Sequence, residues 1–371
     1  MRPLSILALE PYGALSHRLF LEGLRDHSRH RLDIAMLPGR KWKWRMRTAA
    51  LHFAPLLANA ERPDLLLVSD FLNLAELEAL LPPERRGVPA LAYFHENQLT
   101  YPLQGHESRD DHFALTHVHA LLVARKALFN SAFHRESFLA ELPRFLDLVP
   151  DIDLRWVLDE VTRRSHVMPL GTDLPAREPR LPSGRAPVIL WSHRWEYDKN
   201  PAAFLEAVAA LKAKGKAFRV RLLGERFRRA PPELEGLREL LGEDLLADGF
   251  LGDREAYRSA LIDCDIVVSS AIHEFFGLGT LEAIRSGLLP VLPDDLAYPE
   301  LLPPPERSVG RFLYRRDHGL APTLERALEA VREGEWFEER RELVRFTEGF
   351  HWERLAPRYD RVFEEVAASG L

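Results

Sequence analysis

The sequence predicts an α/β protein made of two doubly wound lobes, each built around a parallel sheet. Two series of short apolar runs alternate with amphipathic helical stretches, and this alternation is typical of parallel βα units. Residues 175–186, rich in proline and charge, lie between the two series and are expected to form an exposed linker. The length of 371 residues also favours two domains, because it exceeds what one hydrophobic core normally supports.

The predicted elements follow in chain order. Residues 1–174 form the predicted first domain, with strands at 4–9, 32–37, 64–69, 89–94, 127–130 and 166–170. Residues 187–349 form the predicted second domain, with strands at 188–192, 218–223, 246–251, 265–269 and 288–292. Residues 350–371 are expected to form a terminal helix.

Composition narrows the functional classes. The formal charge of −6 gives no overall attraction to nucleic acid, so any RNA site must be a local patch. The lone cysteine, Cys264, cannot form an internal disulfide and is expected to be a small buried residue. The apolar run that ends at Glu10 is too short for a signal peptide, and no run approaches membrane-spanning length. A cytoplasmic protein without stable membrane insertion is therefore expected.

Two glutamates, Glu274 and Glu282, stand eight positions apart with an aromatic pair and two glycines between them. Gly277 and Gly279 disfavour an unbroken helix, so we expect a strand, a glycine loop and then a helix. The helix end would present backbone N–H groups to a phosphate, and carboxylates beside it could accept hydrogen bonds from vicinal hydroxyls. The N–H groups in question belong to Gly277, Leu278, Gly279 and Thr280. The alternative is a solvated pair of carboxylates.

A second polar loop follows the predicted strand at 188–192 and leads into a predicted helix at 202–213. Pro201 suits the start of that helix, where its missing N–H costs nothing. Arg194 and Lys199 stand five apart on the loop, where fixed cations could offset charge on a phosphate. The alternative is that both residues serve solubility.

Four polar residues end the predicted buried strand at 89–94. Open α/β sheets bind ligands at the carboxyl ends of their strands, so this run is a candidate binding site. It is not a zinc-protease helix, because no second histidine follows Glu96 at the required spacing. The alternative for His95 is a satisfied structural residue. The run consists of His95, Glu96, Asn97 and Gln98.

Together these motifs resemble those of retaining glycosyltransferases of the GT-B fold. The segment that begins at Phe94, Phe-His-Glu-Asn-Gln-Leu-x-Tyr-Pro, is similar to a signature of the tRNA-queuosine mannosyltransferases. The resemblance implies two Rossmann-like lobes, with the terminal helix crossing back to the first. It also implies that the first lobe holds the acceptor and the second lobe holds the donor.

The resemblance assigns roles to the motif residues. Arg194 and Lys199 would contact the donor diphosphate, and the Gly277–Thr280 backbone would assist them. Glu274 would bind the donor sugar and Glu282 the nucleotide ribose. His95 would orient or polarise the reacting hydroxyl, while Glu96, Asn97 and Gln98 would help to bind the acceptor. No protein nucleophile is assigned.

The resemblance further implies GDP-mannose as donor, queuosine in the anticodon loop of tRNA(Asp) as acceptor, and no metal or other cofactor. Two alternatives stay open. One is the same fold acting on a lipid or small-molecule acceptor, and the other is a non-catalytic RNA-binding protein on this scaffold.

The loop after the first strand resembles the family's Tyr-Gly-Gly-Ser-His stretch, and the resemblance makes Ser16 and His17 acceptor-binding candidates. Ala14 and Leu15 replace the two glycines, so the loop is expected to approach a ligand less closely. Ser16 is also expected to cap the following helix.

Basic residues and tryptophans alternate in residues 38–47. Cations there could hold a phosphate backbone while the rings stack on unpaired bases, and the family has a comparable stretch whose partner is tRNA. A membrane contact and a solvated loop are the alternatives. Trp42, Trp44 and Met46 would share a face only in an extended segment. The candidate RNA-binding residues are Arg40, Lys41, Trp42, Lys43, Trp44 and Arg45.

Three histidines cluster on a predicted helix at 111–123. His112 and His119 would share a face, but no cysteine or well-spaced carboxylate completes a metal site with them and His117. A partly exposed, hydrogen-bonded cluster without a metal is expected.

Overall fold

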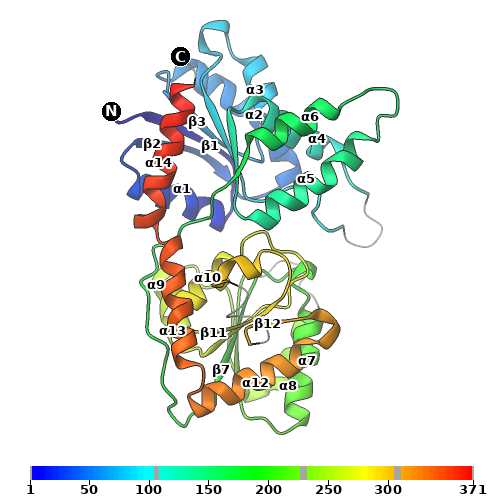
Figure 1. Ribbon diagram of the computed structural model, residues 1–371, viewed down its shortest axis with the longest axis vertical. Coiled ribbons are helices and arrows are strands. Elements are labelled where there is room, and N and C mark those ends of the chain that lie inside the picture. The colour runs from blue at the N-terminus through cyan, green and yellow to red at the C-terminus, as the bar shows by residue number, and fades with distance from the viewer. Residues whose placement is uncertain (1, 104–107, 226–231, 305–310, 370–371) are drawn as a thin grey trace. The chain divides into compact units, whose positions relative to one another are not determined.

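The computed structural model describes residues 2–103, 108–225, 232–304 and 311–369. The chain divides into two compact units. Unit 1 comprises Met1–Asp173 and Phe350–Leu371, and unit 2 comprises Leu174–Gly349. Within the described ranges, each unit contains one six-stranded sheet flanked by helices (Figure 1).

The sheet of unit 1 is parallel and has the strand order β2-β1-β3-β4-β5-β6. Its strands are β1 (Ser5–Gly13), β2 (Arg31–Pro38), β3 (Leu65–Ser69), β4 (Ala90–Phe94), β5 (Lys126–Phe129) and β6 (Ser165–Val167). Its helices are α1 (Leu15–His27), α2 (Trp42–Asn59), α3 (Leu74–Leu80), α4 (Asp111–Val123), α5 (Ala132–Leu146), α6 (Arg155–Arg164) and α14 (Trp352–Ala368).

The sheet of unit 2 is also parallel, in the order β12-β11-β10-β7-β8-β9. Its strands are β7 (Val188–Ser192), β8 (Arg219–Leu223), β9 (Leu245–Gly249), β10 (Ile266–Val268), β11 (Leu289–Pro293) and β12 (Leu313–Tyr314). Its helices are α7 (Pro201–Ala213), α8 (Glu233–Leu241), α9 (Arg254–Ile262), α10 (Leu278–Arg285), α12 (Leu320–Glu333) and α13 (Phe337–Phe346).

Apolar runs made these strands predictable. All residues of β3, β4 and β11 are buried, as expected when helices cover both faces of a parallel sheet. Each predicted strand is present, and the two-residue β12 is an addition. The predicted α/β fold class is therefore confirmed. Cys264 is buried as well, and its thiol donates to the carbonyl of Ala260.

Helix α14 belongs to unit 1 although unit 2 precedes it in the chain (Figure 1, red). Its Trp352 lies against two glycines: a Cβ on Gly23 would stand 2.0 Å from the indole, and one on Gly171 would stand 2.4 Å from it. Thr172 bridges to His351, and Tyr359 donates to the carbonyl of Pro169 at 2.9 Å. The glycines thus leave the space in which α14 closes unit 1.

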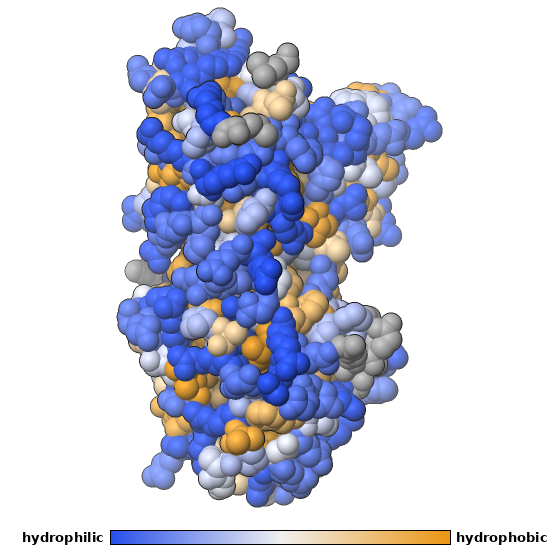
Figure 2. Space-filling view, turned by 60° about the vertical axis from the view of Figure 1, so that its left-hand side comes forward, coloured by the Kyte–Doolittle hydropathy of each residue, from blue (hydrophilic) through white to orange (hydrophobic). Residues whose placement is uncertain are grey.

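Hydrophilic residues cover most of the surface seen in Figure 2, where hydrophobic residues form small, separated groups. Among the described residues, no helix is both long enough and apolar enough to cross a membrane.

Candidate functional site

In unit 2, the loops after β7 and β10 bring Lys199 and Glu274 together. These strands are paired, so their carboxyl ends lie side by side. The ammonium of Lys199 donates to the carbonyl of His273 at 2.8 Å and lies 3.4 Å from the Glu274 carboxylate. Asp198, which is fully buried, stands 3.1 Å away on the same loop. The predicted diphosphate-binding lysine is thus buried among internal acceptors and adjoins the predicted sugar-binding glutamate.

The charges of this pair stabilise each other. Burial alone would raise the pKa of Glu274, but Lys199, with His193 and His273, lowers it to about 2. Burial opposes the charge of Lys199 too, yet Glu274 and Asp198 raise its pKa. Both groups are therefore ionised at neutral pH, and Glu274 can only accept hydrogen bonds.

Two histidines that the sequence analysis passed over flank the pair. Burial, and then the charge of Lys199, lower the pKa of His193 to about 4, and the same causes act on His273 with the same result. Both rings are neutral at pH 7. His193 forms a hydrogen bond with the backbone of Val268.

Arg194 occupies a more open position than Lys199. Its guanidinium lies 3.3 Å from the carboxylate of Glu196, and its side chain is 43% exposed. Of the two predicted phosphate-binding cations, Arg194 is therefore the one that a solvent-borne anion can reach without displacing a buried contact.

The glycine loop has the predicted conformation. Gly277 has a φ of 87° and directly precedes α10, so the N–H groups of the predicted phosphate-binding segment form the first turn of a helix. Glu282 is buried further along α10 and receives two hydrogen bonds from Arg254 on α9, at 2.5 and 3.2 Å. The sequence analysis missed Arg254. A ribose bound by Glu282 would have to share its carboxylate with this guanidinium.

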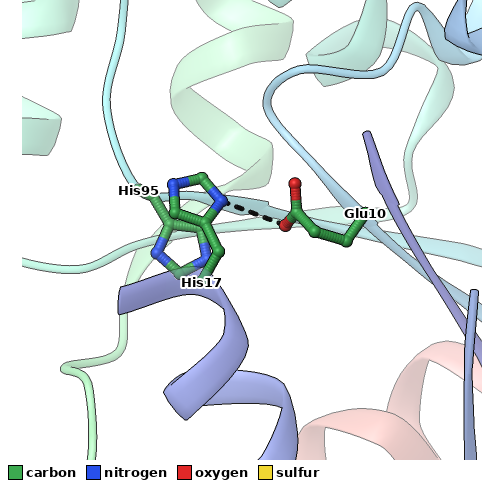
Figure 3. Close-up of side chains that lie close together, drawn as sticks. All are labelled: Glu10, His17 and His95. Atoms are coloured by element: carbon green, nitrogen blue, oxygen red, sulfur yellow. Dashed lines mark hydrogen bonds and ion pairs between the residues drawn. The ribbon is translucent and has the colours of Figure 1, made fainter. Parts of the chain in front are cut away.

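In unit 1, polar side chains gather where β1, β3 and β4 end. Asp70 accepts backbone N–H bonds from His95 and Glu96, each at 3.3 Å. The imidazole rings of His17 and His95 stack with centroids 3.8 Å apart, and Nδ1 of His17 lies 3.1 Å from Oε2 of Glu10 (Figure 3). Predicted residues His17 and His95 are thus brought together, with Glu10 and Asp70 as partners that sequence reasoning missed.

The other polar residues after β4 partly organise their own loop. Asn97 is fully buried, and its side-chain oxygen accepts from the backbone and hydroxyl of Thr100 at 2.8 and 3.1 Å. The backbone N–H of Gln98 donates to His117, and its side chain donates to Glu96 at 3.2 Å.

The prediction that Ser16 caps the first helix is wrong. Helix α1 begins at Leu15 and its N-cap residue is Ala14, without a side-chain cap. Ser16 therefore lies inside the first helical turn, where its hydroxyl cannot take the N-cap position.

The basic and aromatic segment splits into two faces, because α2 begins at Trp42. Trp42 and Met46, four residues apart, pack against Phe71 and Phe113. Trp44 points outward and is 64% exposed. The exposed cations around it are Arg40, Lys41 and Lys43, while Arg45 is partly buried.

One group of described residues has the composition of a metal site: ligand-type atoms of Glu10, His17 and His95 all lie within 4.8 Å of one another. Their geometry is that of a hydrogen-bonded stack. The rings are nearly parallel, at 22°, and Nδ1 of His17 faces the carboxylate. Metal ligands instead direct their lone pairs at one point. On α4, His117 is buried while His112 and His119 are exposed.

Comparison with known proteins gives two family matches. The model of the tRNA-queuosine alpha-mannosyltransferase N-terminal domain matches residues 5–172, and that of glycosyl transferases group 1 matches residues 175–329. A tRNA-queuosine alpha-mannosyltransferase of Drosophila melanogaster is 33% identical over 383 residues, covering 98% of this chain and 97% of the relative.

Solved structures share the fold at low identity. Sucrose-phosphate synthase from Thermosynechococcus elongatus superposes with a TM-score of 0.74 at 17% identity, covering 98% of this chain and all of that one. The catalytic domain of starch synthase IV from Arabidopsis thaliana gives 0.72 at 14%, covering 99% of this chain and all of that one. The predicted GT-B fold is confirmed.

Proposed function

The chain belongs to the tRNA-queuosine alpha-mannosyltransferase family, and from this we propose that it transfers mannose from GDP-mannose to queuosine in the anticodon loop of tRNA(Asp). The observation that carries the proposal is identity to the Drosophila relative along nearly the whole length of both chains. The pair of the buried Lys199 and the partly buried Glu274 supports a transfer reaction, because it places a fixed cation and an ionised acceptor at adjacent strand ends.

On the donor side, negative charge develops on the diphosphate as it leaves. Arg194 and Lys199, with the backbone N–H groups of Gly277–Thr280, offset that charge. Glu274 accepts hydrogen bonds from sugar hydroxyls and Glu282 from the ribose. The mannose keeps its anomeric configuration, and the proposal includes no covalent protein nucleophile, metal or other cofactor.

On the acceptor side, His95 accepts a hydrogen bond from the hydroxyl that attacks the sugar. Burial lowers the pKa of His95 well below its ordinary value, and the charges of His17 and His134 add to this effect. The ring is therefore neutral and has a lone pair available for an incoming hydroxyl.

The tRNA would contact the outer face around the start of α2. Arg40, Lys41 and Lys43 supply exposed positive charge beside the exposed ring of Trp44. These groups suit phosphates and an unstacked base, respectively. A cytoplasmic location follows from the proposed acceptor.

The test is mass spectrometry of nucleosides from queuosine-containing tRNA incubated with the protein and a panel of GDP- and UDP-sugars. We expect a hexose on queuosine with GDP-mannose alone. Consumption of a sugar nucleotide without modified tRNA would move the acceptor to a lipid or metabolite. Binding of tRNA with no sugar nucleotide consumed would overturn the enzymatic proposal.

A further inference from the structure

Glu10, His17 and His95 form a buried row of side chains contributed by β1, by α1 and by the loop after β4 (Figure 3). The sequence separates these residues, and the sheet places them in contact. His95 is the residue proposed above to meet the acceptor hydroxyl. Glu10 and His17 are more deeply buried than His95, at 1% and 4% exposure, and therefore cannot bind a large acceptor themselves.

The carboxylate of Glu10 is held rigidly. Its Oε1 accepts the backbone N–H of Tyr12 at 2.8 Å and the hydroxyl of Ser69 at 3.0 Å. Its Oε2 faces Nδ1 of His17 at 3.1 Å. Since a carboxylate only accepts, Nδ1 of His17 must carry the hydrogen in this contact. Glu10 thus fixes both the orientation of the His17 ring and the site of one of its protons.

Of the two stacked rings, His17 is the one whose pKa is raised. Burial alone would lower its pKa, but Glu10, with contributions from Asp70 and Glu96, raises it. A cation at His17 disfavours a second charge on the His95 ring stacked upon it. Within the stack, the pKa of the His17 ring is thus raised and that of the His95 ring is lowered.

Other groups confine His95 without supplying it a proton. Its backbone N–H donates to Asp70, and its carbonyl accepts from the side chain of Asn130 at 2.9 Å. The rings of Phe20 and Tyr93 meet its ring edge-on, at 5.1 and 4.8 Å. The backbone and the ring of His95 are thus held from several directions.

We propose that Glu10 and His17 form a positioning pair that keeps the imidazole of His95 fixed and neutral, so that it accepts a hydrogen bond from the acceptor hydroxyl. The inference rests on the role of His95 in the proposed function. It assigns to His17 an indirect role through His95, instead of the direct acceptor contact expected from the sequence.

The charges around His95 determine in which direction its pKa should change when a neighbour is replaced. Glu10 on β1, Asp70 after β3 and Glu96 after β4 are acidic, while His17 on α1 and His134 on α5 oppose a positive charge on His95. In unit 1, α14 contributes the hydroxyl of Tyr359, which is directed to the backbone. Replacing His17 by glutamine removes one of the two neighbouring imidazoles that lower the pKa of His95, and should therefore raise that pKa.

The experiment compares wild type with His17→Gln and Glu10→Gln. At saturating GDP-mannose, the tRNA is varied to give kcat and kcat/KM for tRNA against pH, and in a second series GDP-mannose is varied to give its KM. We expect kcat to fall about tenfold or more and the acid limb of kcat/KM to move to higher pH. The KM for GDP-mannose should not change. A matched control, His318→Gln, removes an exposed histidine of unit 2 and should leave rate and profile as in wild type.

A double-mutant cycle separates positioning from packing. If His17 acts through His95, then His17→Gln should cost little further activity in a His95→Gln background. Full additivity, or a loss of activity without any shift of the acid limb, would show a packing role alone and overturn the inference. Wild-type turnover in His95→Gln would instead overturn the proposed role of His95.

A measurement on the unmutated protein guards against variants that fail to fold. With labelled histidines, nitrogen-15 spectra should show a neutral His95 ring beside a protonated His17 ring at pH 6. Two neutral rings would contradict the inference. So would a stoichiometric bound metal that is absent from His17→Gln, because the row would then be a ligand set.

Discussion

At the scale of single residues, Lys199 has two roles. It links the loops after β7 and β10, and it belongs to the proposed donor site. Its ammonium links the carbonyl of His273, the carboxylate of Glu274 and that of Asp198. Removing the cation leaves the buried carboxylate of Asp198 and the partly buried one of Glu274 without a compensating charge, whereas neutralising one acid leaves the other paired. The two partners are therefore not equivalent for stability.

From this asymmetry, Lys199→Met should destabilise the protein by roughly 3–5 kcal/mol, the usual cost of breaking a buried ion pair. Glu274→Gln should cost clearly less. Urea unfolding followed by tryptophan fluorescence would measure both. Equal losses in the two variants would contradict the arrangement around Lys199.

Glu274→Gln should affect catalysis more strongly than stability. Glu274→Gln keeps the shape of the side chain but replaces an ionised acceptor by an amide, and should lower mannosyl transfer about a hundredfold or more. The control is Glu255→Gln on the exposed face of α9, which should be inert. Transfer at the wild-type rate in Glu274→Gln would remove this residue from the proposed site.

The sequence indicated which polar residues end the strands, but not which partners they meet. Lys199, Glu274 and His95 follow apolar runs, and this position, together with the motifs around them, predicted proximity to a ligand. Arg254 gave no such signal, and Asp70, which also follows an apolar run, was passed over. The contacts of both arise only when separate βα units are placed side by side. Register between units is a tertiary property, and local spacing does not encode it.

At the scale of elements, the start of α2 shows why an alternating pattern misled in part. The alternation of basic and aromatic residues is compatible with an extended segment, whereas the chain forms a helix from Trp42. The i and i+4 positions of Trp42 and Met46 both face the core, and this pairing favours the helix. The two tryptophans therefore have different roles.

We expect Trp44→Ala to weaken tRNA binding about tenfold, the value of one base stacked on an aromatic ring, with little change in stability. Trp42→Ala should instead lower the melting temperature, because it removes a ring packed on Phe113. Filter binding and thermal unfolding would separate the two effects. A Trp44→Ala variant that binds tRNA like wild type would exclude this face as the RNA contact.

The packing of α14 within unit 1 gives a second prediction at this scale. Gly23→Ala and Gly171→Ala would each place a methyl group inside the indole of Trp352, and should destabilise unit 1 by about 1–3 kcal/mol. Gly349→Ala, whose added methyl meets nothing within 4 Å, is the matched control. Calorimetry that found all three variants alike would argue against this packing.

At the scale of the whole molecule, buried neutral histidines should make the protein sensitive to mild acid. Burial lowers the pKa of His117 to about 3, and burial with Lys199 lowers those of His193 and His273 to about 4. The unfolded chain takes up protons near pH 6.5, before the folded chain does, so stability falls as pH drops from 6.5 towards 4. His17 acts in the opposite sense, because its pKa is raised.

The melting temperature should therefore decrease between pH 7 and pH 5 at constant ionic strength. Over this range each of these histidines should lower the free energy of unfolding by about 1–2 kcal/mol. His117→Gln should reduce the slope of unfolding free energy against pH, because glutamine does not titrate. The glutamine oxygen can still accept the hydrogen bond from the N–H of Gln98, so the packing there is kept. An unchanged slope in that variant would show that His117 does not contribute to it.

The fold class was predictable because apolar runs mark each strand and amphipathic helices separate them. The lobe to which α14 belongs was expected from the resemblance, and not from the helix's own pattern. The pattern of an amphipathic helix indicates that one face is buried, but not which sheet covers that face. The glycines that accept Trp352 lie far away in the chain, so their role was not readable locally.

The membership of α14 in unit 1 has a consequence for protein synthesis. On the ribosome, unit 2 emerges whole before α14 does, so it can fold while unit 1 still exposes the apolar surface that Trp352 and Phe363 later cover. Unit 1 is made first but completed last. A chain stalled before residue 352 would carry a finished second lobe and an unfinished first one, and such nascent chains should be the ones that chaperones retain.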